Sequence, residues 1–179
     1  MQTLTFRTAT VDDIDALVAL VTSAYRGEAS RAGWTTEADF LDGARIDPEV
    51  LRQDILRPRS LVLLVEQDAR LVACAHIADE DGAGYFGMFS VAPGLQGGGI
   101  GKALLEQAER IVRDEWRLLQ MRMTVIDIRD ELIAFYQRRG YRRTGIHKPF
   151  PYGDARFGQP LRDDLRFEVL EKPLQEDAA

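Results

Sequence analysis

The feature that most constrains the fold is a cluster of glycines directly ahead of a helix-forming stretch. Five of the 15 glycines of this 179-residue chain lie between positions 94 and 101, within VAPGLQGGGIGKALLEQAERIV at residues 91–112. The start of a helix leaves several main-chain N–H groups unpaired and carries partial positive charge, and glycine lets the backbone approach a ligand closely. A flexible loop would show the same composition. The apolar strand before the cluster and the long helix after it favour an anion-binding strand–loop–helix unit.

The apolar pattern along the rest of the chain predicts a mixed α/β sheet. Alternating residues predict strands over 4–9, 61–66, 71–78, 84–92, 120–128, 141–147 and 165–173. Helical spacing predicts helices over 11–27, 36–41, 48–56, 99–118 and 130–140. We expect one domain over residues 1–179 in the order βααβββαβαββ, in which the two short helical patterns at 36–41 and 48–56 stand as one helical element, with antiparallel and parallel neighbours in the sheet and a frayed tail over 174–179.

The loop does not match two common phosphate-binding motifs. A P-loop ending at residues 101–102 requires glycine at position 96 and Ser or Thr at 103, where this chain has glutamine and alanine. A dinucleotide fingerprint started at Gly97 or Gly99 ends on lysine or leucine instead of Gly or Ala. Neither a P-loop nor a dinucleotide fold is therefore expected.

The remaining pattern, Q/R-x-x-G-x-G/A at Gln96 to Gly101, resembles the acetyl-CoA loop of the GNAT superfamily of N-acetyltransferases. Val91-Ala92-Pro93 before it, Leu104 after it and the order of strands and helices over residues 4–170 are similar as well. The resemblance implies a GNAT-like, mostly antiparallel sheet of six to seven strands with helices on both faces. It also implies that main-chain amides of the loop bind the pyrophosphate of acetyl-CoA and that the preceding strand pairs with the pantetheine arm. The cofactor-binding residues so implied are Phe89, Ser90, Val91, Gln96, Gly97, Gly98, Gly99, Ile100, Gly101 and Lys102.

A second segment, ELIAFYQRRGY at 131–141, resembles the other signature of the superfamily. An aromatic-Tyr pair, Phe135 and Tyr136, is followed by Gly140 and Tyr141. The spacing alone is also that of a helix core face with a glycine cap. The resemblance implies that Tyr136 is the catalytic general acid and contacts the cofactor, because a phenolic hydroxyl can protonate or hydrogen-bond a departing thiolate.

One position departs from the superfamily pattern. Arg129 stands where many relatives have asparagine, and the strand before it ends in Asp127. We expect the two to form a solvated ion pair, with either one pointing at the acceptor as the alternative. No general base stands out among the candidates, which are His76, His147, Glu28, Glu37, Asp127 and Tyr85. His76 lies in an alternating strand, where a hydrogen-bonded core histidine is the usual reading.

The resemblance also indicates where an acceptor binds. The corresponding segments are YRGEASRAGWTTEAD at 25–39 and KPFPYGDARFG at 148–158. Both combine aromatic and charged residues, which suits a pocket with a few oriented polar groups but is equally typical of polar loops held down by aromatics. The predicted substrate-binding residues are Tyr25, Arg26, Glu28, Trp34, Tyr85 and Tyr152. Arginines here favour an acceptor that carries a carboxylate.

Composition limits the partners. The net charge of −6 argues against nucleic acid, which is bound through Lys/Arg clusters. No signal peptide and no apolar run of about 18 residues is found, so we expect no membrane partner and a cytoplasmic protein. Cys74, the only cysteine, reads as a small apolar strand residue, which suits a reducing compartment. We expect no metal, and the resemblance makes a homodimer through the C-terminal strands plausible.

Together these features predict an acetyl-CoA-dependent N-acetyltransferase. It would move the acetyl group to the primary amine of a small amine or amino-acid-like acceptor by direct transfer in a ternary complex. The alternative is a non-catalytic acyl-CoA-binding sensor or regulatory module, against which the retained Phe-Tyr pair argues. A purely structural domain is disfavoured because a glycine cluster is a poor way to begin a merely structural helix.

Overall fold

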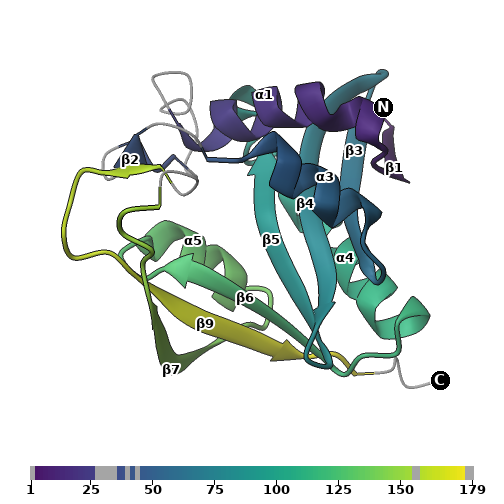
Figure 1. Ribbon diagram of the computed structural model, residues 1–179. Coiled ribbons are helices and arrows are strands. Elements are labelled where there is room, and N and C mark those ends of the chain that lie inside the picture. Colours follow the sequence, from purple (N-terminus) through teal and green to yellow (C-terminus); the bar gives the residue numbers. More distant parts are fainter. Residues whose placement is uncertain (1–2, 27–35, 39–40, 43–44, 155–157, 176–179) are drawn as a thin grey trace.

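The computed structural model describes residues 3–26, 36–38, 41–42, 45–154 and 158–175, and its centre is a seven-stranded sheet (Figure 1). The strand order is β1-β3-β4-β5-β6-β9-β7. All neighbours are antiparallel except β5 and β6, so the predicted mixed, mostly antiparallel sheet is confirmed. The strands are β1 (Leu4–Thr8), β3 (Ser60–Gln67), β4 (Arg70–Glu80), β5 (Ala83–Val91), β6 (Gln120–Ile126), β7 (Arg142–Pro149) and β9 (Arg166–Pro173).

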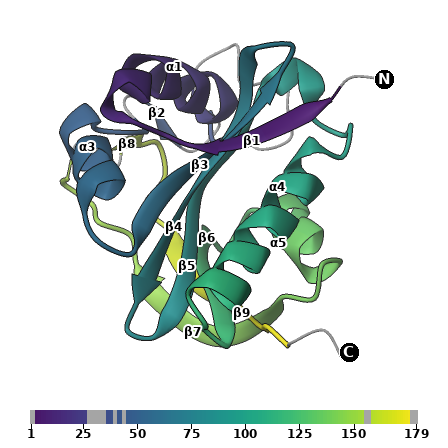
Figure 2. The same ribbon diagram turned by 90° about the vertical axis from the view of Figure 1, so that its right-hand side faces the viewer.

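Helices cover both faces of the sheet, as Figure 2 shows. One face carries α1 (Ile14–Tyr25) and α3 (Pro48–Leu56), and the other carries α4 (Ile100–Arg110) and α5 (Asp130–Gln137). Successive residues of β4 are buried on alternate faces: Cys74 packs with α1 and α3, whereas Ala73 and Ala75 pack on the side of α4 and α5. Short turns at η1 (Val11–Asp13), η2 (Pro93–Leu95) and η3 (Ile111–Glu115) complete the helical segments.

The sheet forks between β5 and β6. Their parallel pairing is limited to Gly84 with Met121 and Tyr85 with Arg122, after which the strands diverge (Figure 1). The ladder between β4 and β5 shifts register between Cys74 and His76, and Met88 in this bulge has a φ of +54°. A bulge bends its strand and interrupts pairing. Beyond Tyr85, therefore, β5 presents main-chain groups with no partner strand at the fork.

A partly exposed ion pair between Arg7 and Asp13 holds the start of α1. Asp13 accepts hydrogen bonds from Arg7 Nη1 at 2.9 Å and Nη2 at 2.8 Å, and from the Thr10 N–H at 2.8 Å. These bonds favour the ionised carboxylate, first of all the one from the Arg7 guanidinium, and lower the pKa of Asp13 to about 2. The contact ties β1 to the helix that follows it.

Three local predictions are wrong. The helix expected over 36–41 is not present in the described residues: residues 36–38 are not helical, and Leu41 begins the short strand β2 (Leu41–Asp42), which pairs with β8 (Gln159–Pro160). The helix expected over 99–118 keeps its regular α form only to Arg110, and 111–115 form a wider π turn. Leu174 does not fray, because it is 6% exposed and its N–H donates to the carbonyl of Leu119 at 2.8 Å.

No helix within the described ranges is both long enough and apolar enough to cross a membrane.

Candidate active site

A groove of about 580 Å³ lies where the glycine loop meets α5. Gly97 and Gly99 have φ values of +91° and +85°, and Gly99 is the N-cap of α4. Residues that carry a side chain rarely adopt such φ angles, so the glycines allow the chain to turn sharply from β5 into the helix. The groove is lined by Phe89, Val91, Gln96, Gly97, Gly99, Gly101, Lys102, Glu131, Ala134, Phe135, Arg138 and Arg139.

The main-chain amides of the loop are available to a ligand. The first bond of α4 runs from the N–H of Ala103 to the carbonyl of Gly99 at 3.0 Å. Within the described chain, the N–H groups of residues 97–102 donate no hydrogen bond to the protein. Unpaired amides at the positive end of a helix bind anions, and Lys102, Arg138 and Arg139 line the same groove. The two arginines were not among the residues predicted from the sequence.

Most of the predicted cofactor residues line this groove. The exceptions are Ser90, whose Oγ donates to the carbonyl of Met88 at 3.0 Å, Ile100, which packs into the core at 6% exposure, and Gly98. Gly101 lies so close to β5 that an added Cβ would be 2.8 Å from Phe89 Cζ. The helix start is therefore packed directly against the aromatic ring at the end of the groove.

Tyr136 lies on α5 at the inner end of the fork. Its ring packs 6.0 Å from the ring of Phe89 and 6.3 Å from that of Phe86, measured between centroids, and it is 3% exposed. The hydroxyl lines the cavity in the fork and makes no hydrogen bond to any described residue. Burial first, and then the neighbouring Tyr25, raise the pKa of Tyr136 well above 10, so the hydroxyl keeps its proton. Tyr136 thus belongs to the core face of α5 and also lines the cavity.

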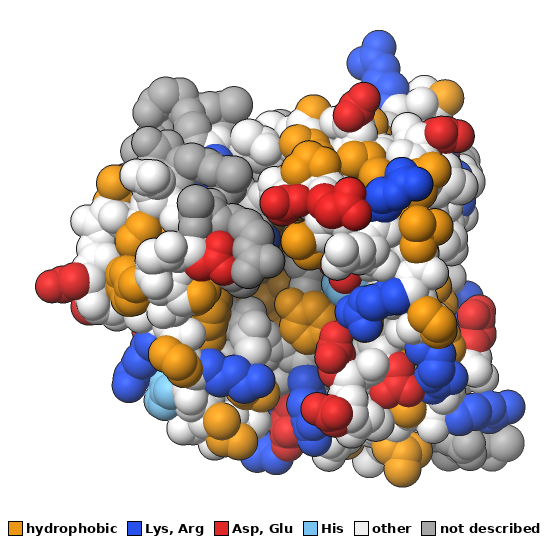
Figure 3. Space-filling model, viewed as in Figure 1, with side chains coloured by type: hydrophobic (Ala, Val, Ile, Leu, Met, Phe, Trp, Pro, Cys, Tyr) orange, Lys and Arg blue, Asp and Glu red, His pale blue; other side chains and the backbone are white. Residues whose placement is uncertain are grey.

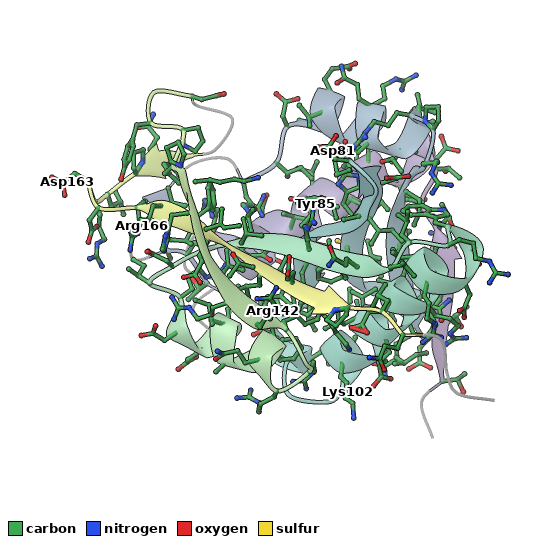
Figure 4. All side chains as sticks on the ribbon, turned by 90° about the horizontal axis from the view of Figure 1, so that it is seen from below. Asp81, Tyr85, Lys102, Arg142, Asp163 and Arg166 are labelled. Atoms are coloured by element: carbon green, nitrogen blue, oxygen red, sulfur yellow. The ribbon has the colours of Figure 1, made fainter. Side chains whose placement is uncertain are left out.

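The cavity beyond Tyr136 has a volume of about 200 Å³. In Figure 3 the front of the molecule is hollowed at the fork between β5 and β6, over a largely apolar floor. Figure 4 shows Tyr85 and Lys102 on opposite sides of the sheet, so the cavity and the glycine loop are approached from different faces. Phe89 lines both the groove and the cavity and lies at their junction.

The structure brings three of the predicted acceptor residues, Tyr25, Arg26 and Tyr85, to this cavity. Glu28 and Trp34 lie outside the described residues. Tyr152 does not line the cavity, because its hydroxyl accepts a hydrogen bond from the N–H of Leu165 at 2.8 Å and donates to Arg162 O at 3.2 Å. Phe150 from the same loop lines the cavity in its place. The pairing of β2 with β8 brings the two predicted acceptor segments together.

Tyr25 connects α1 to the bulge in β5. Its hydroxyl donates to the carbonyl of Phe89, and its ring lies beneath two guanidinium groups, with Arg45 Cζ 4.7 Å and Arg129 Cζ 5.4 Å from the ring centroid. Aromatic faces attract cations at such distances. Tyr25 therefore holds both the exposed strand edge and the charged wall of the cavity in place.

The charged wall is built on Glu37, which is 4% exposed. One carboxylate oxygen accepts a hydrogen bond from Arg26 Nη1, and the other accepts from Arg129 Nη1 at 3.3 Å. Burial alone would raise the pKa of Glu37, but the guanidiniums of Arg129, Arg45 and Arg26 outweigh it, and the pKa lies below the usual value. A carboxylate held this way is a poor proton acceptor.

Arg129 does not form the expected solvated pair with Asp127. It points into the cavity toward Glu37 with its side chain 8% exposed, whereas Asp127 pairs with Arg166 and lies 3.9 Å from His147 Nε2. The prediction failed because Glu37, far away in the sequence, supplies the partner. Arg129 lines the cavity at the fork, and the alternative that it points at the acceptor stays a prediction.

The two histidines lie outside the cavity. His76 is the buried, hydrogen-bonded histidine that its strand predicts: Ser60 Oγ donates to the carbonyl of Asp54 at 2.6 Å, so its 2.8 Å bond to His76 is donated by the ring Nε2. His76 borders a neighbouring cavity of about 220 Å³. His147 Nε2 lies 3.4 Å from Glu168 Oε1 on β9.

Cys74 is fully buried, and burial raises the pKa of its thiol to about 12. A nucleophilic cysteine needs thiolate character and access. Cys74 has neither.

The described chain thus combines a sheet forked at its one parallel strand pair, a glycine loop before a helix, and a cavity at the fork. The sequence matches the model of the Acetyltransferase (GNAT) family over residues 18–141, and the chain belongs to that family. The GNAT resemblance of the two motifs is thereby confirmed, as is the enzyme class, acetyl-CoA-dependent N-acetyltransferase.

Solved structures share the fold over nearly their whole length. The ribosomal-protein-S18-alanine N-acetyltransferase of Escherichia coli aligns at a TM-score of 0.71 and 14% identity, covering 98% of this chain and 97% of that one. A ribosomal-protein-alanine N-acetyltransferase from Brucella melitensis aligns at 0.69 and 22%, covering 95% and 99%. The PaiA N-acetyltransferase of Thermoplasma acidophilum, solved with coenzyme A, aligns at 0.67 and 18%, covering 96% and 99%. No curated protein matches the sequence. At these identities the likeness shows the fold alone.

Proposed function

We propose that the protein transfers an acetyl group from acetyl-CoA to the primary amine of a small amine or amino-acid-like acceptor, directly within a ternary complex. The observation that carries this proposal is the junction at Phe89 and Tyr136. Phe89 lines both the groove on one face and the cavity on the other, and Tyr136 packs against it at 6.0 Å. A donor and an acceptor that enter from opposite faces would meet at this point.

The residues present fit coenzyme A. A diphosphate matches the unpaired amides of residues 97–102 and the nearby Lys102, Arg138 and Arg139. The amide-containing pantetheine arm matches the edge of β5 beyond Tyr85, where β6 no longer pairs with it. When bound, the cofactor supplies an acetyl group activated as a thioester.

The chain's own groups contribute positioning and a proton. Tyr136 keeps its proton in the cavity because its pKa is raised, and its hydroxyl can donate to negative charge that develops on sulfur. The reference pKa of a thiol is about 8.5, well below that of Tyr136, so the main contribution of the hydroxyl is a hydrogen bond to the charge developing on sulfur. The cations of Arg129 and Arg45 lower the pKa of Tyr136 and so ease proton transfer. The buried thiol of Cys74 supports direct transfer, without an acyl-cysteine.

The test is release of coenzyme A from acetyl-CoA over a panel of primary amines, followed with a thiol reagent. Turnover with at least one amine, lowered by Tyr136→Phe, is expected. The alternative, a sensor that binds acyl-CoA without turnover, predicts binding in calorimetry and no amine-dependent release. If Tyr136→Phe releases coenzyme A as fast as the unaltered protein, the proposed acetyl transfer is retained, but Tyr136 does not act as the proton donor.

A cytoplasmic location, one domain over residues 1–179 and a homodimer through the C-terminal strands are further parts of the proposal. The strand β7 lies at the edge of the sheet, and its side chains are mostly exposed, which leaves an edge for a second copy. Arg142 and Arg143 on this strand already pair with Glu171 and Glu168 of β9, so their charges would not oppose such an interface. Sedimentation equilibrium would distinguish a monomer from a dimer.

A further inference from the structure

We propose that Arg45 binds an anionic group of the acceptor, so that the preferred acceptors are small amines that also carry a carboxylate. The inference rests on the proposed acetyl transfer. Arg45 was not among the residues singled out from the sequence, and it reaches the cavity from the segment between β2 and α3.

Arg45 forms an ion pair with Glu37 but no hydrogen bond to it. The two oxygens of Glu37 already accept hydrogen bonds from two different guanidiniums, those of Arg26 and Arg129. Arg45 Nε is 3.6 Å from Glu37 Oε1, which is an ion-pair distance without a hydrogen bond. Within the described residues, Arg45 donates no hydrogen bond at all. A guanidinium has five N–H donors, and here all five are available.

Arg45 is also the most accessible of the three arginines around Glu37. The side chain of Arg45 is 30% exposed, against 3% for Arg26 and 8% for Arg129, so it is the guanidinium of this wall that a ligand can reach. The ring of Tyr25, 4.7 Å from its Cζ, holds it in one orientation. It lines both the cavity at the fork and the neighbouring one beside His76. A fixed planar fork in a cavity suits bidentate recognition of a carboxylate.

The cavity is small and its charged wall carries more cations than anions among the described residues. At about 200 Å³ it is smaller than most ligand pockets, which span roughly 300–1,000 Å³, so the acceptor is small and its charged group lies near the wall. Three guanidiniums surround a single carboxylate among the described residues there. An acceptor anion would supply the missing negative charge where water is partly excluded.

Two carboxylates border the neighbouring cavity and do not neutralise this wall. Asp47 caps α3, accepting from the N–H of Glu49 at 2.8 Å and of Val50 at 3.3 Å. Asp54 lies 3.4 Å from Arg57 Nε and 3.8 Å from His76 Nδ1. Both have partners of their own, so among the described residues Glu37 is the carboxylate that Arg45 pairs with, and the N–H donors of Arg45 remain without an acceptor there.

The experiment compares matched acceptors. L-alanine, L-leucine and L-phenylalanine are each assayed with the corresponding amide and the decarboxylated amine, by release of coenzyme A. For the series that turns over, we expect kcat/KM for the carboxylate form to exceed that for the other two by about tenfold or more. Arg45→Gln should abolish this preference by raising the acceptor KM, while the KM for acetyl-CoA stays unchanged. Arg45→Lys, which keeps the charge without the fork, should retain part of it.

The control variant is Arg59→Gln, which removes an exposed guanidinium paired with Asp79 at 2.7 Å and should leave the preference intact. A measurement on the unaltered protein covers the case in which Arg45→Gln does not fold: propionate should inhibit competitively against the amine, and propionamide should not. If no amine in any panel releases coenzyme A, the proposed function fails. If amines react without a preference for the carboxylate, or Arg45→Gln keeps that preference, the inference fails and the proposed function stands.

Discussion

Replacing Gly99 by alanine isolates the conformational demand of the glycine loop. Gly99 has a φ of +85° and a ψ of 0°, and a Cβ added there would meet no heavy atom within 4 Å. Any effect of the substitution therefore comes from the backbone and not from crowding. Holding an L-residue in the left-handed region costs about 1–2 kcal/mol.

That cost appears in one of two measurable quantities. If the variant loop keeps the native turn, the free energy of unfolding falls by about 1–2 kcal/mol. If the loop relaxes instead, its amides leave the groove and coenzyme A must restore them on binding. The Kd then rises by roughly 5- to 30-fold, since 1.4 kcal/mol is a factor of ten. The sum of the two losses should be about 1–2 kcal/mol.

Isothermal titration calorimetry with coenzyme A and chemical denaturation of the same sample measure both quantities. The matched control is Gly98→Ala, because Gly98 lacks a positive φ and its Cβ would lie at an ordinary 3.5 Å from the carbonyl of Leu95. Gly98→Ala should change neither the Kd for coenzyme A nor the free energy of unfolding. Gly99→Ala with unchanged Kd and unchanged stability would refute the reasoning, as would a Gly98→Ala variant that is equally damaged.

Other predictions concern the remaining groups. Tyr136→Phe should lower kcat about tenfold or more with little change in stability. Tyr141→Phe, which loses a 3.2 Å hydrogen bond to Glu109, should leave kcat intact. Steady-state assays and denaturation of both variants test these two expectations. Asp13 has a folded pKa of about 2 against 3.8, so its stabilising contribution is present above pH 3.8 and is lost as the pH falls toward 2. Unfolding curves of Asp13→Asn should show lower stability at pH 7 and a flatter loss between pH 4 and 2, and curves parallel to those of the unaltered protein would contradict the assignment. Cys74→Ala should retain turnover, and the unaltered thiol should resist alkylation at pH 8, because its pKa is about 12; rapid labelling followed by mass spectrometry would show that the site is open.

Local sequence patterns were sufficient for much of the fold. The alternation in residues 71–78 predicts β4, and the glycines before residue 100 predict a turn into a helix, because both depend on neighbours in the sequence. The helix predicted over 36–41 failed for the opposite reason. Leu41 packs with Ile126, Phe150 and Leu165 from distant segments, and this tertiary contact outweighs local helical spacing.

The charged wall of the cavity could not be found from the sequence for the same physical reason. Arg45, Arg129 and Glu37 come from three separate segments, and only the closed fold places them around Tyr25. Glu37 was one of six candidate bases and Arg129 was expected to pair with Asp127, whereas Arg45 was not singled out. The proposed cofactor loop is one continuous segment, which is why a sequence pattern could predict its residues.

The central claim is that the main-chain amides at the start of α4 grip the diphosphate of coenzyme A. A crystal structure with coenzyme A bound tests it most directly. We predict diphosphate oxygens within about 2.7–3.2 Å of main-chain nitrogens between residues 97 and 102, with the sulfur near Tyr136. Coenzyme A bound elsewhere on the molecule, with those nitrogens untouched, would contradict the account.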